Sequence, residues 1–364
     1  MNKTRELTDL TACRALFALW VFAYHVNLHA QFSHWFGPLG IVIDHGYLGV
    51  DGFFVLSGYI LARVDAKIPL TRPGLLHFWG KRLARLYPVH LAVILLLVVI
   101  FLGGIAIGLT PRQPDRFGTM ALIDNLLLIQ SWGTLNHWTW NYPSWSISTE
   151  WAGYLLFPFI AASFSRFFNL AIVAAMPLCF FILCVVSFEF HGLNLTFAAS
   201  LLRFFPEFIA GMATAIVVPM FADEWPGARI GLIGALAAAA AAWGGHDALT
   251  VFGIWLMIYG LAMQGDAEKP AYLGRIKPLR FIGIISYPLY MSFAPAELVT
   301  SQLFRRLHHP PASVPLAYAG MLMGLTFGLG LLLHVLIEKP ARVALNRRLD
   351  PERAQALAEG TVPL

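Results

Sequence analysis

The chain has 364 residues, of which 58% are hydrophobic and only 12% are charged. Soluble domains carry about 25% charged residues, so this composition excludes a water-soluble catalytic domain, an acidic binding tail and a disordered chain. The formal net charge of +5 then reflects basic residues placed beside membrane spans, and no nucleic-acid partner is predicted. We predict an all-α fold, a polytopic membrane helix bundle.

Ten apolar runs, bounded by charged residues, glycine or proline, predict about ten transmembrane helices. They lie near residues 11–30, 46–64, 88–109, 144–163, 170–188, 204–222, 230–243, 248–263, 281–299 and 314–337. Another apolar segment, residues 120–133, is too short to cross and contains Asp124 and Asn125, so we expect an interfacial or re-entrant helix there. The membrane domain is predicted to cover residues 1–340, with a cytoplasmic tail at 341–364.

Lysine and arginine residues divide unevenly between the two sides of these spans. Twenty of the 25 lie on the same side as the N-terminus. The five on the other side are Arg112, Arg116, Arg203, Arg305 and Arg306. Basic residues concentrate on the cytoplasmic side of membrane proteins, so both termini are predicted to be cytoplasmic.

The first span contains two ionisable residues, Arg14 near its cytoplasmic start and His25 in its outer half. Eleven residues at 100° each bring both side chains to one helical face, about 16 Å apart along the axis. Ionisable groups within a membrane are costly and mark functional sites. A snorkelling arginine and a packed histidine are the structural alternatives.

Asp51 lies near the outer end of the second predicted span, GYLGVDGFFVLSGYILAR. The glycines of this span let neighbouring helices approach closely. Asp51 is in a position to orient a histidine or to pair with a cation. The structural alternative is a boundary carboxylate on a close-packed helix.

A basic stretch precedes the third predicted span. The preference for basic cytoplasmic loops explains Arg63 and Arg72, but the segment FWGKRLARLYP is more specific. It places Arg82 and Arg85 one turn apart on one helical face. Two guanidinium groups on one face suit the phosphate groups of a cytoplasmic ligand.

Glu150 lies several residues into the fourth predicted span, on the exterior side, between Trp145 and Trp151. Tryptophan gathers at this depth in membrane proteins. The carboxylate could support a histidine or bind a substrate hydroxyl, and the tryptophan rings could stack on a sugar. An interfacial glutamate in water is the structural alternative.

Histidine and cysteine do not indicate a metal centre. The histidines gather in or beside the predicted exterior loops, but their spacing matches no metal-binding motif. The three cysteines lie inside apolar runs, as packed thiols do. No metal is predicted.

Six segments of the chain together resemble the acyltransferase 3 family. Its members are integral membrane enzymes that move acyl groups, often acetyl, from cytoplasmic acyl-CoA to carbohydrate acceptors. The segments are Arg14-x10-His25, GYLGVDGFFVLSGYI, the pattern F-x3-R-x2-R-x2-P over residues 78–88, PSWSISTEWAGYLLFP, LGRIKPLRFIGIISYPLYM and EKPAR at 338–342. They occur in family order over almost the whole chain.

The resemblance implies that Arg14 and His25 are functional and that Arg82 and Arg85 belong to the acyl-CoA site. It places Glu150 at an equivalent polar position. It also implies a multi-pass protein of the bacterial cytoplasmic (inner) membrane.

The chain departs from the family pattern at two positions. The family commonly has an aspartate three residues before the first-span arginine, where this chain has Thr11 and a displaced Asp9. It often has a histidine at the position of Phe293. The second departure bears on any role of that position in handling the acceptor.

These features predict an O-acyltransferase of the O-acetyltransferase type that acts across the membrane. The phosphates of acyl-CoA, the donor substrate, would rest on the paired arginines, and its pantetheine arm would pass Arg14 toward His25. His25 would act as general base on a hydroxyl of an exterior carbohydrate or glycolipid acceptor, with Asp51 or Glu150 fixing its tautomer. A covalent acyl-histidine is equally open.

A proton-coupled secondary transporter of a small polar solute is the alternative. His25, Asp51, Glu150 and Arg14 would then form a proton relay. However, the sequence shows neither an inverted repeat nor a pair of corresponding broken helices, and a carrier does not need two spaced arginines at its cytoplasmic side. The sequence therefore favours the enzyme.

Overall fold

A computed structural model describes residues 7–65, 67–109, 113–164, 169–197, 199–222, 224–267 and 272–349. These residues form helices, turns and connections, with no β-strand among them. The chain divides into two compact units. Unit 1 comprises Met1–Lys67, Phe159–Leu195 and Ala199–Ser286, and unit 2 comprises Ile68–Pro158, Thr196–Ala198 and Tyr287–Leu364.

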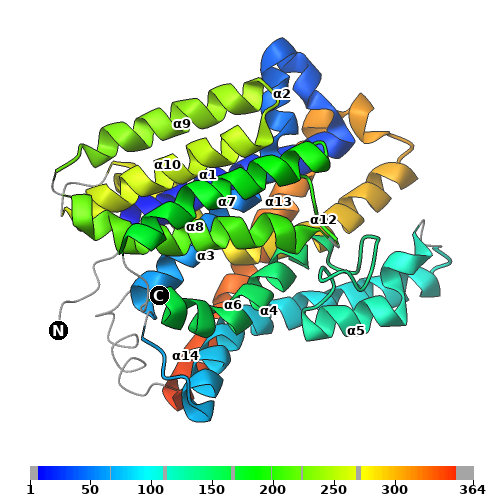
Figure 1. Cartoon of the computed structure of the whole chain (residues 1–364). Coiled ribbons are helices and arrows are strands. Elements are labelled where there is room, and N and C mark those ends of the chain that lie inside the picture. The colour runs from blue at the N-terminus through cyan, green and yellow to red at the C-terminus, as the bar shows by residue number, and fades with distance from the viewer. Residues whose placement is uncertain are drawn as a thin grey trace. The chain divides into compact units, whose positions relative to one another are not determined.

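The described part of unit 1 contains eight α-helices, of which α1, α7, α8, α9 and α10 lie side by side (Figure 1). They are α1 (Thr8–Ala30), α2 (Gly40–Asp44), α3 (Gly49–Val64), α7 (Asn169–Glu189), α8 (Ser200–Phe221), α9 (Gly227–Trp243), α10 (Asp247–Asp266) and α11 (Lys277–Ile284). The closest pairs are α9 with α10 and α3 with α8.

Glycine allows α3 and α8 to meet backbone against backbone. A Cβ atom on Gly58 would collide with the carbonyl oxygen of Phe208, and one on Gly211 would collide with the carbonyl oxygen of Val55. Small residues at membrane helix contacts permit this approach. The glycine-rich second span predicted from the sequence is therefore a close-packed helix of unit 1.

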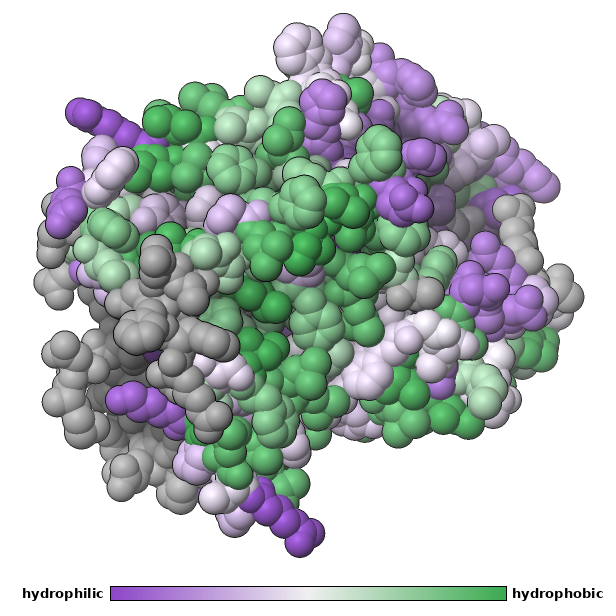
Figure 2. Space-filling model, in the orientation of Figure 1, coloured by the Kyte–Doolittle hydropathy of each residue, from purple (hydrophilic) through white to green (hydrophobic). Residues whose placement is uncertain are grey.

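The outer surfaces of α7, α9 and α10 are apolar. Figure 2 shows hydrophobic side chains along these helices and hydrophilic ones toward their ends. Exposed large side chains include Phe181 and Phe188 on α7, Leu232 and Leu236 on α9, and Phe252 on α10. Such helices suit lipid rather than water.

Unit 2 contains α4 (Arg72–Ala106), α5 (Thr119–Leu127), most of α6 (Trp145–Phe164), α12 (Ser286–Arg306) and α13 (Pro315–Leu333). A π-helical turn, His334–Glu338, joins α13 to α14 (Lys339–Leu349). The predicted tail is thus helical to Leu349, while residues 350–364 lie outside the described residues.

The connection from α5 to α6 folds back along the start of α6. Ser131 Oγ donates a hydrogen bond to the Trp145 carbonyl oxygen at 2.9 Å, and Ser148 Oγ donates to the Leu128 carbonyl oxygen at 2.9 Å. Buried irregular backbone in a membrane protein requires such internal partners. Helix α5 has nine residues and is too short to cross a bilayer, as expected for residues 120–133.

Helices occur at all ten predicted span positions. Among the described residues, five helices are long and apolar enough to cross a membrane, or six if α11 and α12 are taken together as one bent span. The chain is therefore a helical membrane protein. The count of ten crossings and the cytoplasmic placement of both termini stay predictions.

Two helices begin earlier than the predicted spans. The span predicted from residue 88 is part of α4, which begins at Arg72 and continues through Pro88 as one helix of 35 residues. Arg203, placed just before the span predicted from residue 204, lies in the first turns of α8 and is fully buried. An arginine at the edge of an apolar run resembles a boundary residue in sequence, but here it has a buried partner.

Candidate active site

His25 lies in the C-terminal half of α1, which is one continuous helix from Thr8 to Ala30. Its Nδ1 atom is 2.8 Å from the carbonyl oxygen of Val21. A carbonyl oxygen can only accept a hydrogen bond, so Nδ1 carries the hydrogen, and in the neutral imidazole Nε2 then holds the lone pair. The helix backbone thereby fixes the tautomer in which Nε2 is the base.

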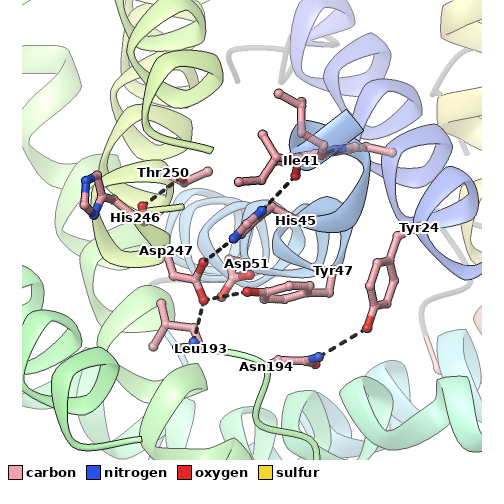
Figure 3. Close-up of polar contacts among 12 residues, drawn as sticks. Tyr24, Ile41, His45, Tyr47, Asp51, Leu193, Asn194, His246, Asp247 and Thr250 are labelled. Atoms are coloured by element: carbon pink, nitrogen blue, oxygen red, sulfur yellow. Dashed lines mark hydrogen bonds and ion pairs between the residues drawn. The ribbon is translucent and has the colours of Figure 1, made fainter. Parts of the chain in front are cut away.

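The Tyr24 ring lies beside His25, and the Tyr47 ring lies beside that of Tyr24. The Tyr24 ring meets the imidazole edge to face, with centroids 5.1 Å apart, and the Tyr47 ring lies 5.4 Å from that of Tyr24. Asn194 donates a hydrogen bond from Nδ2 to the Tyr24 hydroxyl at 3.2 Å. Figure 3 shows both tyrosines with this bond.

Asp247, in the first turn of α10, gathers three further groups (Figure 3). Its Oδ2 atom accepts hydrogen bonds from the Tyr47 hydroxyl and from the backbone N–H of Leu193, both at 2.6 Å. Its Oδ1 atom lies 3.6 Å from Nε2 of His45. The buried carboxylate thus connects α10 to the turn before α3 and to the connection after α7.

The sequence interpretation missed Asp247. The aspartate follows His246 at the start of an apolar run, which is the place where helix-capping residues are found. Gly192 is required beside it, because this residue has φ = 137° and a Cβ atom there would lie 3.0 Å from Asp247 Oδ2. Asp247 therefore makes more contacts than a helix-capping residue needs.

Asp51 is paired with Arg203 of α8. Arg203 Nε donates to Asp51 Oδ1 at 2.6 Å, and its second nitrogen binds Asp51 Oδ2. Both side chains are fully buried. Arg203 also donates to the Tyr47 carbonyl oxygen at 3.1 Å. Asp51 thus takes the cation-pairing role that the sequence allowed, and Glu207 is a further neighbour of this pair.

Arg14 lies eleven residues before His25 on α1. At 100° per residue, this spacing brings both side chains to the same helical face. Its guanidinium carbon is 6.0 Å from the centroid of the Phe53 ring on α3, a cation–π distance. Arg14, His25 and Asp51 all belong to unit 1.

The other predicted site residues belong to unit 2. Arg82 is buried on α4, with its guanidinium carbon 5.3 Å from the Phe78 ring centroid and 5.8 Å from that of Tyr154 on α6. Trp79 Nε1 donates to the Tyr154 carbonyl oxygen at 3.2 Å. Aromatic packing and this bond attach the arginine-bearing turn of α4 to α6.

Glu150 lies on α6 close to this arginine-bearing turn. The Tyr154 hydroxyl donates to Glu150 Oε1 at 2.6 Å. The carboxylate also acts electrostatically on Arg85, as does that of Glu338. Within unit 2, Glu150 is therefore grouped with the residues predicted to bind phosphate.

The two tryptophans predicted to stack on sugar differ in exposure. Trp145 is 7% exposed, so its ring is packed within the protein, whereas Trp151 is partly exposed. Phe293, at the position where the family often has histidine, is buried with its ring 6.4 Å from that of Tyr142. Among the described residues, no group of three or more His, Cys, Asp or Glu side chains is arranged to hold a metal.

These helices and buried polar clusters define a multi-pass helical membrane protein. A family model described as an acyltransferase domain matches residues 7–335. The chain therefore belongs to the acyltransferase 3 family, as its resemblance predicted.

Two relatives illustrate the similarity. The chain is similar to acyltransferase MdmB of Streptomyces mycarofaciens, with 35% identity over 161 residues that cover 42% of this chain and 38% of the relative. It is also similar to O-acetyltransferase OatA of Staphylococcus aureus, with 29% identity over 168 residues that cover 44% of this chain and 25% of the relative. The chain thus spans less than half the length of these relatives. No solved structure matches it.

Proposed function

We propose that the protein is a membrane-embedded O-acyltransferase that moves an acyl group, in the simplest case acetyl, from cytoplasmic acyl-CoA to a hydroxyl of an extracytoplasmic carbohydrate or other cell-surface acceptor. The family match over residues 7–335 supports the acyl-transfer chemistry. The name of the Staphylococcus aureus relative, an O-acetyltransferase, supports an oxygen acceptor. We place the protein in the bacterial cytoplasmic membrane.

The observation that carries this proposal is the fixed tautomer of His25. With Nδ1–H bound to the Val21 carbonyl oxygen, Nε2 can accept the proton of the acceptor hydroxyl. The oxygen then attacks the thioester carbonyl, and the carbon–sulfur bond breaks to release coenzyme A, whose thiolate regains the proton from Nε2. The backbone bond performs the orienting task that the sequence assigned to Asp51 or Glu150.

The donor is proposed to bind unit 2 through the phosphates of coenzyme A. Arg82 and Arg85 lie one turn apart on α4, and the aromatic contacts of Arg82 limit the freedom of its guanidinium group. Guanidinium groups bind phosphate through paired hydrogen bonds. Arg14 is proposed to contact the donor arm, and Trp151 to contact a carbohydrate acceptor.

Mass spectrometry of cell-envelope glycans tests the function. Cells that express the protein should carry an acetyl or other acyl mass that is lost on deletion of the gene. His25→Ala should lower the rate of transfer about 10²–10⁴-fold, as expected for loss of a general base. His34→Ala, which removes an exposed histidine from the same end of unit 1, is the matched control. Wild-type acylation by a folded His25→Ala protein would refute the assignment.

The family match disfavours the transporter alternative. A carrier predicts proton-coupled solute flux that does not depend on acyl-CoA, whereas the enzyme predicts stabilisation by coenzyme A. Proton-coupled solute flux in a protein that does not bind coenzyme A would refute the enzyme proposal and support the carrier.

A further inference from the structure

The segment EKPAR, residues 338–342, matches the family pattern but has no role in the steps above. It begins at the π-helical turn His334–Glu338, which interrupts the helix between α13 and α14. Turns of this kind are rare and frequently occur at functional sites. The extra residue in the turn changes the direction of the side chains that follow it.

Glu338, the last residue of this turn, is buried. Its side chain is 4% exposed, its Oε1 accepts a hydrogen bond from Arg342 at 2.5 Å, and its Oε2 accepts one from Nδ1 of His334 at 2.7 Å. A buried carboxylate is stable only when such partners surround it. The pair also fixes the guanidinium group of Arg342, which is 20% exposed.

The elements that carry Glu338 and Arg342 pack against the helix that carries Arg82 and Arg85. Both the π-helical turn and α14 pack against α4, and the Glu338 carboxylate acts electrostatically on Arg85. Beside Arg85, the Tyr287 hydroxyl of α12 donates to the Leu86 carbonyl oxygen at 2.5 Å. Glu338 therefore holds Arg342 directly, on an element that packs against the helix of Arg82 and Arg85.

The charge of this group favours an anionic ligand. Arg82, Arg85 and Arg342 contribute three guanidinium groups, and Glu150 and Glu338 contribute two carboxylates. Each guanidinium has five N–H donors in a fixed planar fork, a geometry that matches phosphate oxygens. A preference for basic cytoplasmic residues accounts for exposed arginines, but not for one held by a buried carboxylate.

We propose that Arg342 is a third phosphate-binding arginine of the donor site, and that Glu338 holds its guanidinium group on the side of α14 that packs near α4. The inference rests on the proposed function, because it takes coenzyme A as the ligand. Coenzyme A carries a diphosphate and a separate ribose phosphate, and three arginines on two helices suit phosphates that are spaced apart.

Calorimetric titration of the full-length protein in detergent with coenzyme A tests this. Arg342→Ala should weaken binding about ten- to a hundredfold, as for the loss of a charged hydrogen-bonding partner. Arg348→Ala removes the same charge from an exposed position of α14 and should change binding less than about threefold. Arg342→Lys keeps the charge but not the paired geometry, so it should bind coenzyme A more weakly than wild type.

Pantetheine, which lacks the phosphates, is the second probe. The Arg342→Ala protein should bind pantetheine as the wild type does, and this result also shows that the variant is folded. If Arg342→Ala binds coenzyme A like the wild type while Arg85→Ala does not, the inference about Arg342 is wrong and the proposed function stands. If the wild-type protein binds no coenzyme A, the proposed donor is wrong and the inference fails with it.

Discussion

The ion pair of Asp51 and Arg203 should be the most sensitive charged contact of unit 1. Both side chains are 0% exposed and are joined by two hydrogen bonds. Removing one partner of a buried pair leaves an uncompensated charge and costs about 3–5 kcal/mol. Because water does not screen this pair, we expect the upper half of that range for Arg203→Met, which also leaves Asp51 beside Glu207.

The pair of Arg63 and Asp266 supplies the comparison. The Arg63 side chain is 32% exposed, and a partly solvated pair contributes roughly 1 kcal/mol or less. Asp266→Asn should therefore destabilise the protein several times less than Arg203→Met, although each variant breaks one salt bridge of the same unit.

Equilibrium unfolding with sodium dodecyl sulfate in mixed micelles, followed by tryptophan fluorescence, measures both effects. The double variant Asp51→Asn/Arg203→Met removes both charges, so it should be more stable than Arg203→Met alone, with a coupling energy of about 2 kcal/mol or more. If Arg203→Met falls within about 1 kcal/mol of the wild type, or if the single effects simply add, the reasoning about this pair is wrong.

The same variants separate two roles for Asp51. If Asp51 only balances the charge of Arg203, the folded double variant should transfer acyl groups at a rate within about tenfold of the wild type. If Asp51 assists the chemistry, the rate per folded molecule should fall about a hundredfold or more.

The same unfolding assay tests two further contacts. Gly58→Ala should cost about 1–3 kcal/mol because its Cβ atom would meet the Phe208 carbonyl oxygen. Gly320→Ala, with open space around it on α13, should be neutral or slightly stabilising. Equal effects of the two variants would contradict the close packing of α3 and α8. Asp247→Asn should cost about 1–3 kcal/mol because the buried carboxylate accepts two hydrogen bonds. A loss of stability no larger than that of Asp266→Asn would contradict the role of Asp247 in joining α10 to its neighbouring segments.

The sequence predicted the positions of the helices well because the length of each apolar run matches the length of a membrane-spanning helix. It also predicted that Arg82 and Arg85 share a helical face, since their spacing is local. It did not predict that α4 continues through Pro88, because a proline at the edge of an apolar run is typical of a helix start. Neighbouring contacts can compensate a proline inside a membrane helix.

Contacts between residues far apart in the chain could not be predicted from the sequence. Asp51 and Arg203 are 152 residues apart, and their contact depends on the glycine-mediated approach of α3 and α8. Asp247 lies 200 residues from Tyr47. Each residue taken singly resembles a boundary charge, and only the packing of the helices gives it a buried partner.

The bond that orients His25 is local, and so it follows from helix geometry. Within α1 the Val21 carbonyl oxygen faces the residue four positions later, and its second lone pair can accept the imidazole Nδ1–H in addition to the backbone N–H. His45 forms the same bond to the carbonyl oxygen of Ile41 at 2.8 Å. A histidine in this conformation presents Nε2 away from its own backbone, so its partner across Nε2 defines its task. The Asp247 carboxylate lies 3.6 Å from Nε2 of His45, and for His25 we propose that the partner is the acceptor hydroxyl.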